Sequence, residues 1–172
     1  IGIHQSNWEA LVPILDRLDI KIGGIYRHIN NFLLNKLILS IRKSNLNNSK
    51  NFYTPKGKKG AKDLMVAINN NYSIVLLVDQ KDSAGEDVMF FDKIVKTQVG
   101  FLKIARKHNL PIVPIKNTRL ADGKIELNFL EPLLHNNDQI SDSVMMEKIH
   151  KLIESWIASN PSQWFWQHKR FN

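Results

Sequence analysis

The chain has 172 residues, of which 43% are hydrophobic and 23% charged, as is typical of one globular domain with its own core. It has no cysteine, which excludes disulfides and thiolate metal sites. A formal net charge of +8 favours nucleic acid, an acidic protein or an anionic membrane surface as the partner. No apolar run reaches the roughly 18–20 residues that cross a bilayer.

Strands and helices alternate along the first half of the chain. The continuous apolar run at 74–78 predicts a strand that is covered on both faces, as in a parallel sheet. The preceding elements are predicted from caps and periodicity: the end of a strand at 1–3, a helix from a Ser6 cap to about 18 with a kink at Pro13, a strand at 21–26, a helix opened by Asn31, and a helix at about 61–70.

The second half of the chain continues this alternation. After a predicted loop at 81–88, Thr97 is expected to cap a helix over 98–108. Strands at 111–120 and 124–133 are joined across an Asp-Gly turn, and a last helix covers about 143–159. The whole pattern predicts one α/β domain over 1–172, in which helices sandwich a mostly parallel central sheet.

Polar side chains follow three of the predicted strands: His4, Arg27, and the pair Asp79 and Gln80. Ligand sites in open α/β sheets gather at the carboxyl ends of strands, so we expect these side chains to converge there. For Asp79 and Gln80, an ordinary turn at the end of the strand is an equally good interpretation.

His4 and Glu9 are separated by four residues, and this spacing has two interpretations. In the first, Ser6 and Glu9 form a capping box at the start of a helix. In the second, His4 lies just before the helix, whose dipole disfavours a second proton, so the imidazole stays neutral as a general base requires. Glu9 would then fix the tautomer of His4. Because the chain has no Gly-x-Ser-x-Gly elbow and no cysteine, direct transfer to a hydroxyl deprotonated by His4 is favoured over an acyl-enzyme.

Two further segments combine cations with other features. The loop at 55–62 gathers lysines around two glycines, which suits either a phosphate or acidic-partner site or a solvated basic loop. The tail at 164–171 places aromatic residues beside Lys169 and Arg170. This tail is typical of a membrane interface, or of aromatic side chains that close the core.

Six segments in this order resemble the lipid A biosynthesis acyltransferases, the late lauroyl/myristoyl transferases of the glycerophosphate acyltransferase-like fold. The first, HQSNWE, is similar to the family's His-x4-Asp/Glu motif, and the last resembles its terminal Trp-x-His-x-Arg signature. The resemblance covers residues 1–172 and rests on HQSNWE (4–9), YRHINN (26–31), PKGKKGAKDL (55–64), LLVDQKDSAGEDVMFFDKIVKT (76–97), LPIVPI (110–115) and QWFWQHKRF (163–171).

The resemblance implies transfer of a fatty acyl chain from acyl carrier protein to a hydroxyl of a lipid A precursor. The reaction would take place at the cytoplasmic face of the cell inner membrane, with the chain peripherally associated with an anionic membrane surface. No cofactor, metal ion or nucleic acid is predicted. His4 would be the general base and Glu9 its orienting partner. The predicted substrate- and phosphate-binding residues are Arg27, Lys56, Lys58, Asp79, Gln80 and Arg170.

Two features depart from the family pattern. A membrane-anchoring helix normally precedes the His-x4-Glu motif, and we therefore expect the chain to be N-terminally truncated and to lack that anchor. Asp92 stands where the family often has glycine. Two alternatives are an inactive remnant that still binds lipid, and a basic module that binds nucleic acid, although no helix-turn-helix, zinc-finger or RNA-recognition signature is present.

Overall fold

The computed structural model describes residues 1–27, 29–133, 140–167 and 169–171. The chain falls into two compact units. We call residues 9–76 the inserted unit, and residues 1–8 together with 77–172 the terminal unit. The prediction of one acyltransferase domain over 1–172 stays a prediction.

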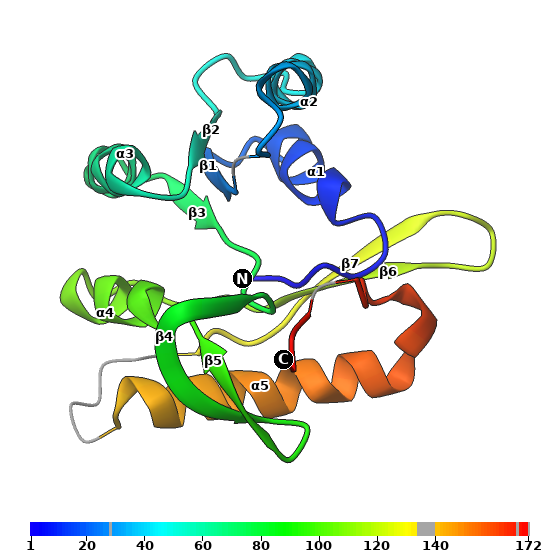
Figure 1. Ribbon diagram of the computed structural model, residues 1–172. Helices are drawn as coiled ribbons and strands as arrows, with labels where there is room; N and C mark the ends of the chain where they lie inside the picture. Colours follow the sequence, from blue (N-terminus) through cyan, green and yellow to red (C-terminus); the bar gives the residue numbers. More distant parts are fainter. Residues whose placement is uncertain (28, 134–139, 168, 172) are drawn as a thin grey trace. The chain divides into compact units, whose positions relative to one another are not determined.

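The inserted unit is built around a parallel sheet with the strand order β2–β1–β3. In the register of this sheet, Gly23 lies opposite both Phe52 and Ile74. Helix α3 covers one face of the sheet, and α1 and α2 lie on the other (Figure 1). The elements are α1 (Leu11–Arg17), β1 (Ile22–Tyr26), α2 (Phe32–Ser44), β2 (Phe52–Pro55), α3 (Lys58–Asn69) and β3 (Ser73–Val75).

Two glycines of the central strand β1 allow aromatic rings of the neighbouring strand β2 to pack closely against it. A Cβ atom at Gly23 would lie 2.7 Å from the ring of Phe52, and one at Gly24 would lie 2.9 Å from the ring of Tyr53. Aromatic rings of β2 therefore cover the space that side chains on β1 would fill. Ile22, at the start of the strand, is fully buried, so β1 forms the centre of this unit's core.

The first helix begins later than the sequence predicts. A short 3₁₀ helix at Trp8–Ala10 precedes α1, whose N-cap is Ala10. Ser6 has a left-handed φ of 53°, and no described residue bonds its hydroxyl, so the prediction of Ser6 as the cap is wrong. Pro13 lies in the first turn of α1, where the N–H that proline lacks has no helical partner, so proline is compatible with this position.

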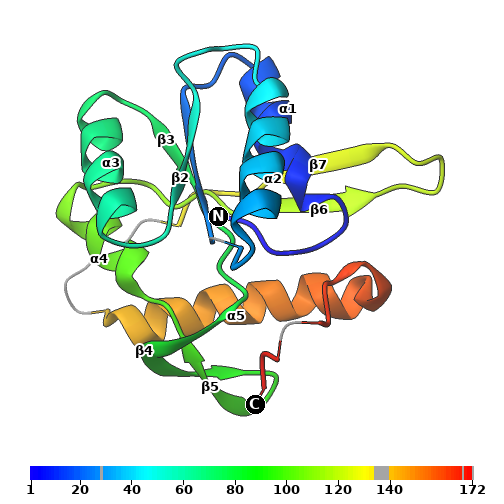
Figure 2. The ribbon, with the colours of Figure 1, turned by 45° about the horizontal axis from the view of Figure 1, so that its top comes forward.

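The terminal unit combines two antiparallel strand pairs with two α-helices. The long helix α5 packs along β4, as two views show (Figures 1 and 2). The core contains Ile149 and Ile153 of α5 together with Phe90 of β4. The elements are β4 (Lys81–Phe90), β5 (Lys93–Thr97), α4 (Gly100–Lys107), β6 (Ile115–Arg119), β7 (Ile125–Phe129), α5 (Asp142–Ser159) and a 3₁₀ helix at Pro161–Gln163.

The β4–β5 hairpin is where the sequence prediction fails most clearly. Residues 81–88, predicted as a loop, belong to β4, and Thr97 ends β5 instead of capping a helix. The turn consists of Phe91 and Asp92, which both have left-handed φ values, of 49° and 56°. Two-residue hairpins need such angles and normally use Asn-Gly or Asp-Gly. Asp92 therefore takes a glycine-like conformation at the position where the family often has glycine.

The mixed α/β class is confirmed, but the predicted central sheet is not shown at that size. The parallel sheet has three strands, and the other strands form antiparallel pairs. The predicted strand at 74–78 is divided: β3 ends at Val75, and Leu77 forms an isolated parallel bridge with Gly2. The β6–β7 hairpin and the last helix are confirmed. Among the described residues, no helix has the length and apolar character needed to cross a membrane.

Candidate functional site

His4 and Asp79 come together because two extended segments of the terminal unit run side by side. Gly2 and Leu77 form a parallel bridge, and the Val78 N–H donates to the Gly2 carbonyl at 3.0 Å. Two residues further along each segment stands a polar side chain, so His4 lies beside Asp79. The predicted convergence of polar groups that follow strands is therefore confirmed for His4, Asp79 and Gln80.

Asp79 accepts hydrogen bonds from His4 and from the tail of the chain. Its Oδ1 lies 2.7 Å from Nδ1 of His4, and its Oδ2 accepts from the His4 backbone N–H at 3.0 Å. The indole N–H of Trp164 also donates to Oδ2, at 2.9 Å. The Asp79 side chain is 0% exposed, and burial raises its pKa, but the hydrogen bonds that His4 and Trp164 donate outweigh burial and hold the pKa below its usual value. Asp79 is therefore an ionised carboxylate at neutral pH.

These hydrogen bonds define the tautomer of His4. Because the Asp79 carboxylate can only accept, the proton lies on Nδ1 of His4. On the other side of the ring, the Gln80 side-chain Nε2 lies 3.1 Å from Nε2 of His4 and donates to its lone pair. The His4 side chain is 12% exposed. The arrangement thus holds a neutral imidazole with its acceptor nitrogen on Nε2, as a general base requires.

The C-terminal segment forms part of the wall around His4. Gln5 pairs with Trp164 in an antiparallel bridge, and the Phe165 N–H donates to the His4 carbonyl at 2.8 Å. The Trp8 ring packs edge-on against His4 and also contacts Phe165, with centroids 5.2 Å apart in both cases. Of the two tail tryptophans, Trp164 is buried and Trp166 is 57% exposed. Sequence reasoning missed the bond from Trp164 to Asp79; the available signal was that a buried indole N–H needs an acceptor.

Arg170 lies inside the terminal unit, where it fixes the last residues of the chain. Its guanidinium donates to the Lys96 carbonyl at 2.8 Å, to Oγ1 of Thr97 at 2.6 Å, and to Nε2 of His150 at 3.2 Å. The same guanidinium lies over the ring of Phe90, 5.1 Å from its centroid. Burial lowers the pKa of Arg170 to about 10, an effect that the negative charge of Asp79 opposes. His168 of the terminal signature lies outside the described residues.

His150 makes the stability of the terminal unit depend on pH. It is fully buried and bonded to the Met89 carbonyl through Nδ1, and burial lowers its pKa to about 4. Between pH 6.5 and 4 the unfolded chain binds a proton here that the folded chain does not. The contribution of His150 to stability is therefore complete above pH 6.5 and falls by roughly 3 kcal/mol as the pH drops to 4.

We expect His150→Gln to lower stability at pH 7, because it disturbs the bonds to Met89 and Arg170, and to flatten the pH dependence between 6.5 and 4. Urea unfolding across this range measures both effects, with His108→Gln as a control for loss of a histidine elsewhere in the same unit. An unchanged slope in His150→Gln would contradict the assignment.

Glu9 belongs to the inserted unit, where Arg42 binds its carboxylate with two nitrogens. The Arg42 Nε donates to Oε2 at 2.9 Å, and Nη2 donates to Oε1. The hydrogen bonds that Arg42 donates to Glu9 raise the pKa of Arg42 although burial opposes this. The guanidinium also lies near the faces of Tyr26 and Tyr53, 5.6 and 5.9 Å from the ring centroids. The role predicted for Glu9, to orient His4, stays a prediction.

The predicted phosphate-binding cations of the inserted unit follow β1 and β2. Arg27, Lys56 and Lys58 are exposed, and the Lys56 N–H donates to the Tyr26 carbonyl at 2.8 Å. This bond keeps the two strand ends together, so Arg27 and Lys56 lie at the same edge of the sheet. Gly60, in the first turn of α3, has to be glycine, because a Cβ atom there would collide with the Pro55 carbonyl oxygen.

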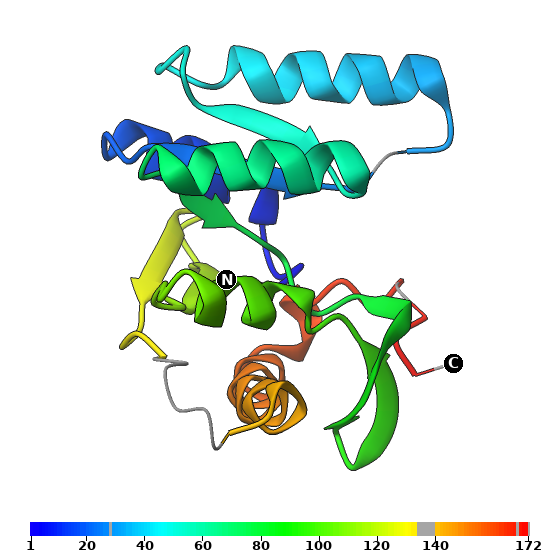
Figure 3. The same ribbon diagram turned by 90° about the vertical axis from the view of Figure 1, so that its left-hand side faces the viewer.

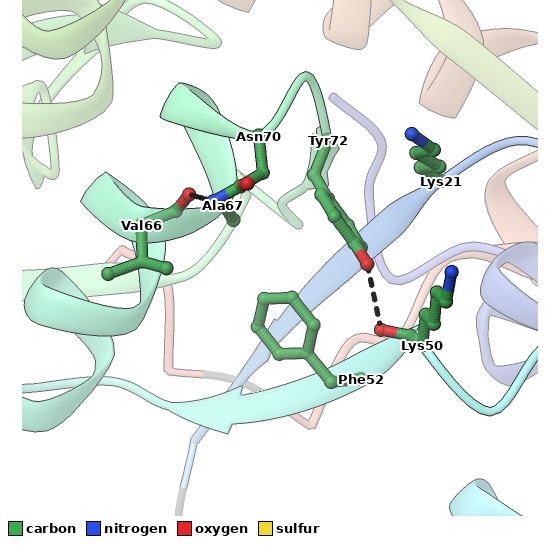
Figure 4. A pocket seen from close by; sticks show the side chains of 7 residues that line it. All are labelled: Lys21, Lys50, Phe52, Val66, Ala67, Asn70 and Tyr72. Atoms are coloured by element: carbon green, nitrogen blue, oxygen red, sulfur yellow. Dashed lines mark hydrogen bonds between the residues drawn. The ribbon is translucent and has the colours of Figure 1, made fainter.

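A groove of about 330 Å³ lies at the opposite edge of the same sheet (Figure 4). Phe52, Val66 and Ala67 form its apolar side, and the hydroxyl of Tyr72 donates to the Lys50 carbonyl at 3.2 Å. Residues 21, 50 and 72 each precede a strand, so the groove faces the amino ends of the strands. It is therefore separate from the edge that carries Arg27 and Lys56.

No group of three or more metal-ligating side chains occurs in the part of the chain that the structure describes. No curated protein matches the sequence. A family model described as bacterial lipid A biosynthesis acyltransferase matches residues 1–172, the full length of the chain. This match agrees with the ordered motifs of the sequence. The chain therefore belongs to the bacterial lipid A biosynthesis acyltransferase family.

Proposed function

We propose that the chain transfers a fatty acyl group from acyl carrier protein to a hydroxyl of a lipid A precursor, with His4 as the general base. The observation that supports this most strongly is the pairing of His4 Nδ1 with the buried Asp79 carboxylate. The pairing leaves Nε2 as the nitrogen that accepts a proton, and family membership supplies the acyl transfer.

In the proposed reaction, Nε2 of His4 takes the proton of the acceptor hydroxyl while its oxygen attacks the thioester carbonyl of the donor. The new ester C–O bond forms, the C–S bond breaks, and the imidazolium returns the proton to the leaving thiolate. Asp79 stabilises the imidazolium and holds the ring in place. The acceptor hydroxyl is proposed to replace Gln80 as the donor to Nε2.

The remaining predicted residues enter the proposal in two ways. Arg27, Lys56 and Lys58 are proposed to bind phosphate of the lipid A precursor or the acidic carrier protein. Glu9 is proposed as a second carboxylate that orients His4. Asp79 and Arg170 are buried and bonded to protein groups, so we propose that they position the site instead of touching substrate. We further propose that the chain works at the cytoplasmic face of the inner membrane, peripherally associated with its anionic surface.

The proposal is tested by incubating the purified chain with an acyl-loaded carrier protein and a lipid A precursor. We expect one acyl group to be added to the precursor, seen by mass spectrometry, with release of an equal amount of carrier thiol. Omission of the lipid acceptor is the control and should prevent thiol release. A folded chain that binds the precursor but adds no acyl group would contradict the proposed activity and support an inactive lipid-binding remnant.

A further inference from the structure

Helix α2 presents an apolar face to solvent. None of its residues is buried, and Phe32 and Leu33 are each 75% exposed. Leu33, Leu37 and Ile41 recur every four residues and so form one stripe along the helix, which we call the apolar stripe. A stripe of this kind normally packs against a protein core. Here it faces away from the sheet that the helix covers.

Polar contacts fix this orientation. On the side facing the sheet, Arg42 binds the carboxylate of Glu9 and lies near the rings of Tyr26 and Tyr53. The side chain of Asn35 accepts a hydrogen bond from the Ile29 N–H at 3.1 Å. The helix would have to break these contacts to turn its leucines inward. The contacts within the inserted unit therefore keep the apolar stripe exposed.

The same unit carries a long stretch of sequence without a negative charge. Residues 20–62 contain no aspartate or glutamate. Within α2 itself, Lys36 and Lys43 are exposed beside the apolar stripe. The cations of this stretch are Lys21, Arg27, Lys36, Arg42, Lys43, Lys50, Lys56, Lys58, Lys59 and Lys62. Long lysine side chains beside leucines can extend their ammonium groups to lipid phosphates while their stems stay apolar.

We propose that α2 lies in the plane of an anionic bilayer surface, with the apolar stripe among the acyl chains and the neighbouring lysines at the phosphates. With 13 residues the helix is about 20 Å long, too short to cross a hydrocarbon core of about 30 Å. The inference rests on the membrane association in the proposed function and names the element responsible for it.

The arrangement of the inserted unit connects this surface with the basic loop. Helices α2 and α3 both begin at the edge of the sheet where the strands end, with β2 passing between them (Figure 3). The first turn of α2, with Phe32 and Leu33, is therefore at the same edge as Arg27 and Lys56. An acidic protein would pair with these cations but leave the leucines in water, and a second copy would bury the leucines but bring like charges together. A bilayer with phosphate head groups can pair with the cations and also bury the leucines.

Vesicle sedimentation tests the inference. We expect the chain to bind vesicles with about 30% phosphatidylglycerol and to bind purely zwitterionic vesicles at least about tenfold more weakly. Leu33→Gln combined with Leu37→Gln should weaken binding to the anionic vesicles by about tenfold or more. Ile94→Gln, at a 69% exposed position of the terminal unit, is the matched control and should bind like the wild type. The inference would be overturned if the double variant bound anionic vesicles as well as the wild type does. It would also be overturned if the wild type bound no vesicles but formed a dimer that the double variant does not form.

The absence of cysteine allows a second, positive measurement. A polarity-sensitive dye on Leu37→Cys should shift to the blue when anionic vesicles are added, and a quencher in the lipid should reduce its emission. The same dye on Ile94→Cys should do neither. A chain that shows the shift but transfers no acyl group would contradict only the proposed reaction. A chain that transfers acyl groups while the Leu37→Cys dye stays in water would contradict only the role of α2.

Discussion

Replacing His4 with asparagine is expected to reduce acyl transfer by about 10³-fold or more, because it removes the proposed proton acceptor of the reaction. Asparagine places its amide nitrogen close to the position of Nδ1 and so keeps a donor for Asp79, which holds the fold around the buried carboxylate together. The variant has no group equivalent to Nε2. The loss should therefore appear in kcat, with little change in melting temperature.

The assay is single-turnover transfer from the loaded carrier protein, followed by mass spectrometry of the lipid. His108→Asn, which alters a histidine of the same unit outside the site, is the matched control and should keep full activity. If His4→Asn transfers acyl groups at the wild-type rate while it is folded, His4 is not the base, whatever family the chain belongs to.

Neutralising Asp79 should have the second-largest effect. Asp79→Asn is nearly isosteric, but an amide cannot accept from all three donors that the carboxylate serves, namely two N–H groups of His4 and the indole of Trp164. The amide group also favours the wrong tautomer of His4 and leaves the imidazolium without a counter-charge. We expect kcat to fall by about 10²- to 10⁴-fold and the acid limb of the pH–rate profile to move to lower pH.

Glu9→Gln is the comparison that separates the two carboxylates. If Glu9 also orients His4, this variant should show the same signature as Asp79→Asn, a lower kcat with a displaced acid limb. If Glu9 acts only through Arg42, the acid limb should stay in place and vesicle binding or KM should change instead. An Asp79→Asn protein with wild-type kcat and an unmoved profile would remove Asp79 from the proposed mechanism.

Local signals in the sequence predict those elements whose caps and turns use common residues. Asn31 caps α2 through a bond from the Leu34 N–H, and Ser141 caps α5 in the same way. The β6–β7 hairpin turns at Gly123, which has a φ of 83°. In contrast, the β4–β5 hairpin turns on Phe91 and Asp92, and a phenylalanine at such a position gives no turn signal. Its existence depends on packing against α5, which local patterns do not contain.

For the site too, contacts between residues near in sequence and contacts made through the fold have to be distinguished. The rule that polar groups gather where strands end brought His4 and Asp79 into one prediction, although 75 residues separate them. The rule could not tell which of two carboxylates bonds Nδ1, because Glu9 is near His4 in sequence and Asp79 is near it through the fold. The predicted cap at Ser6 failed for a local reason: Ser6 has a left-handed backbone, and α1 starts beyond Glu9.

The bonds from Trp164 and Phe165 to the neighbourhood of His4 also set an order of assembly during synthesis. The inserted unit is one continuous stretch and can fold while the rest of the chain is still being made on the ribosome. His4, although it is translated before the inserted unit, has to wait for Trp164 and Phe165, which follow that unit. A chain released early would carry the histidine motif intact yet lack the tryptophan that bonds its carboxylate. Translation through Phe165 is therefore a condition for completing the hydrogen bonds around His4 and Asp79.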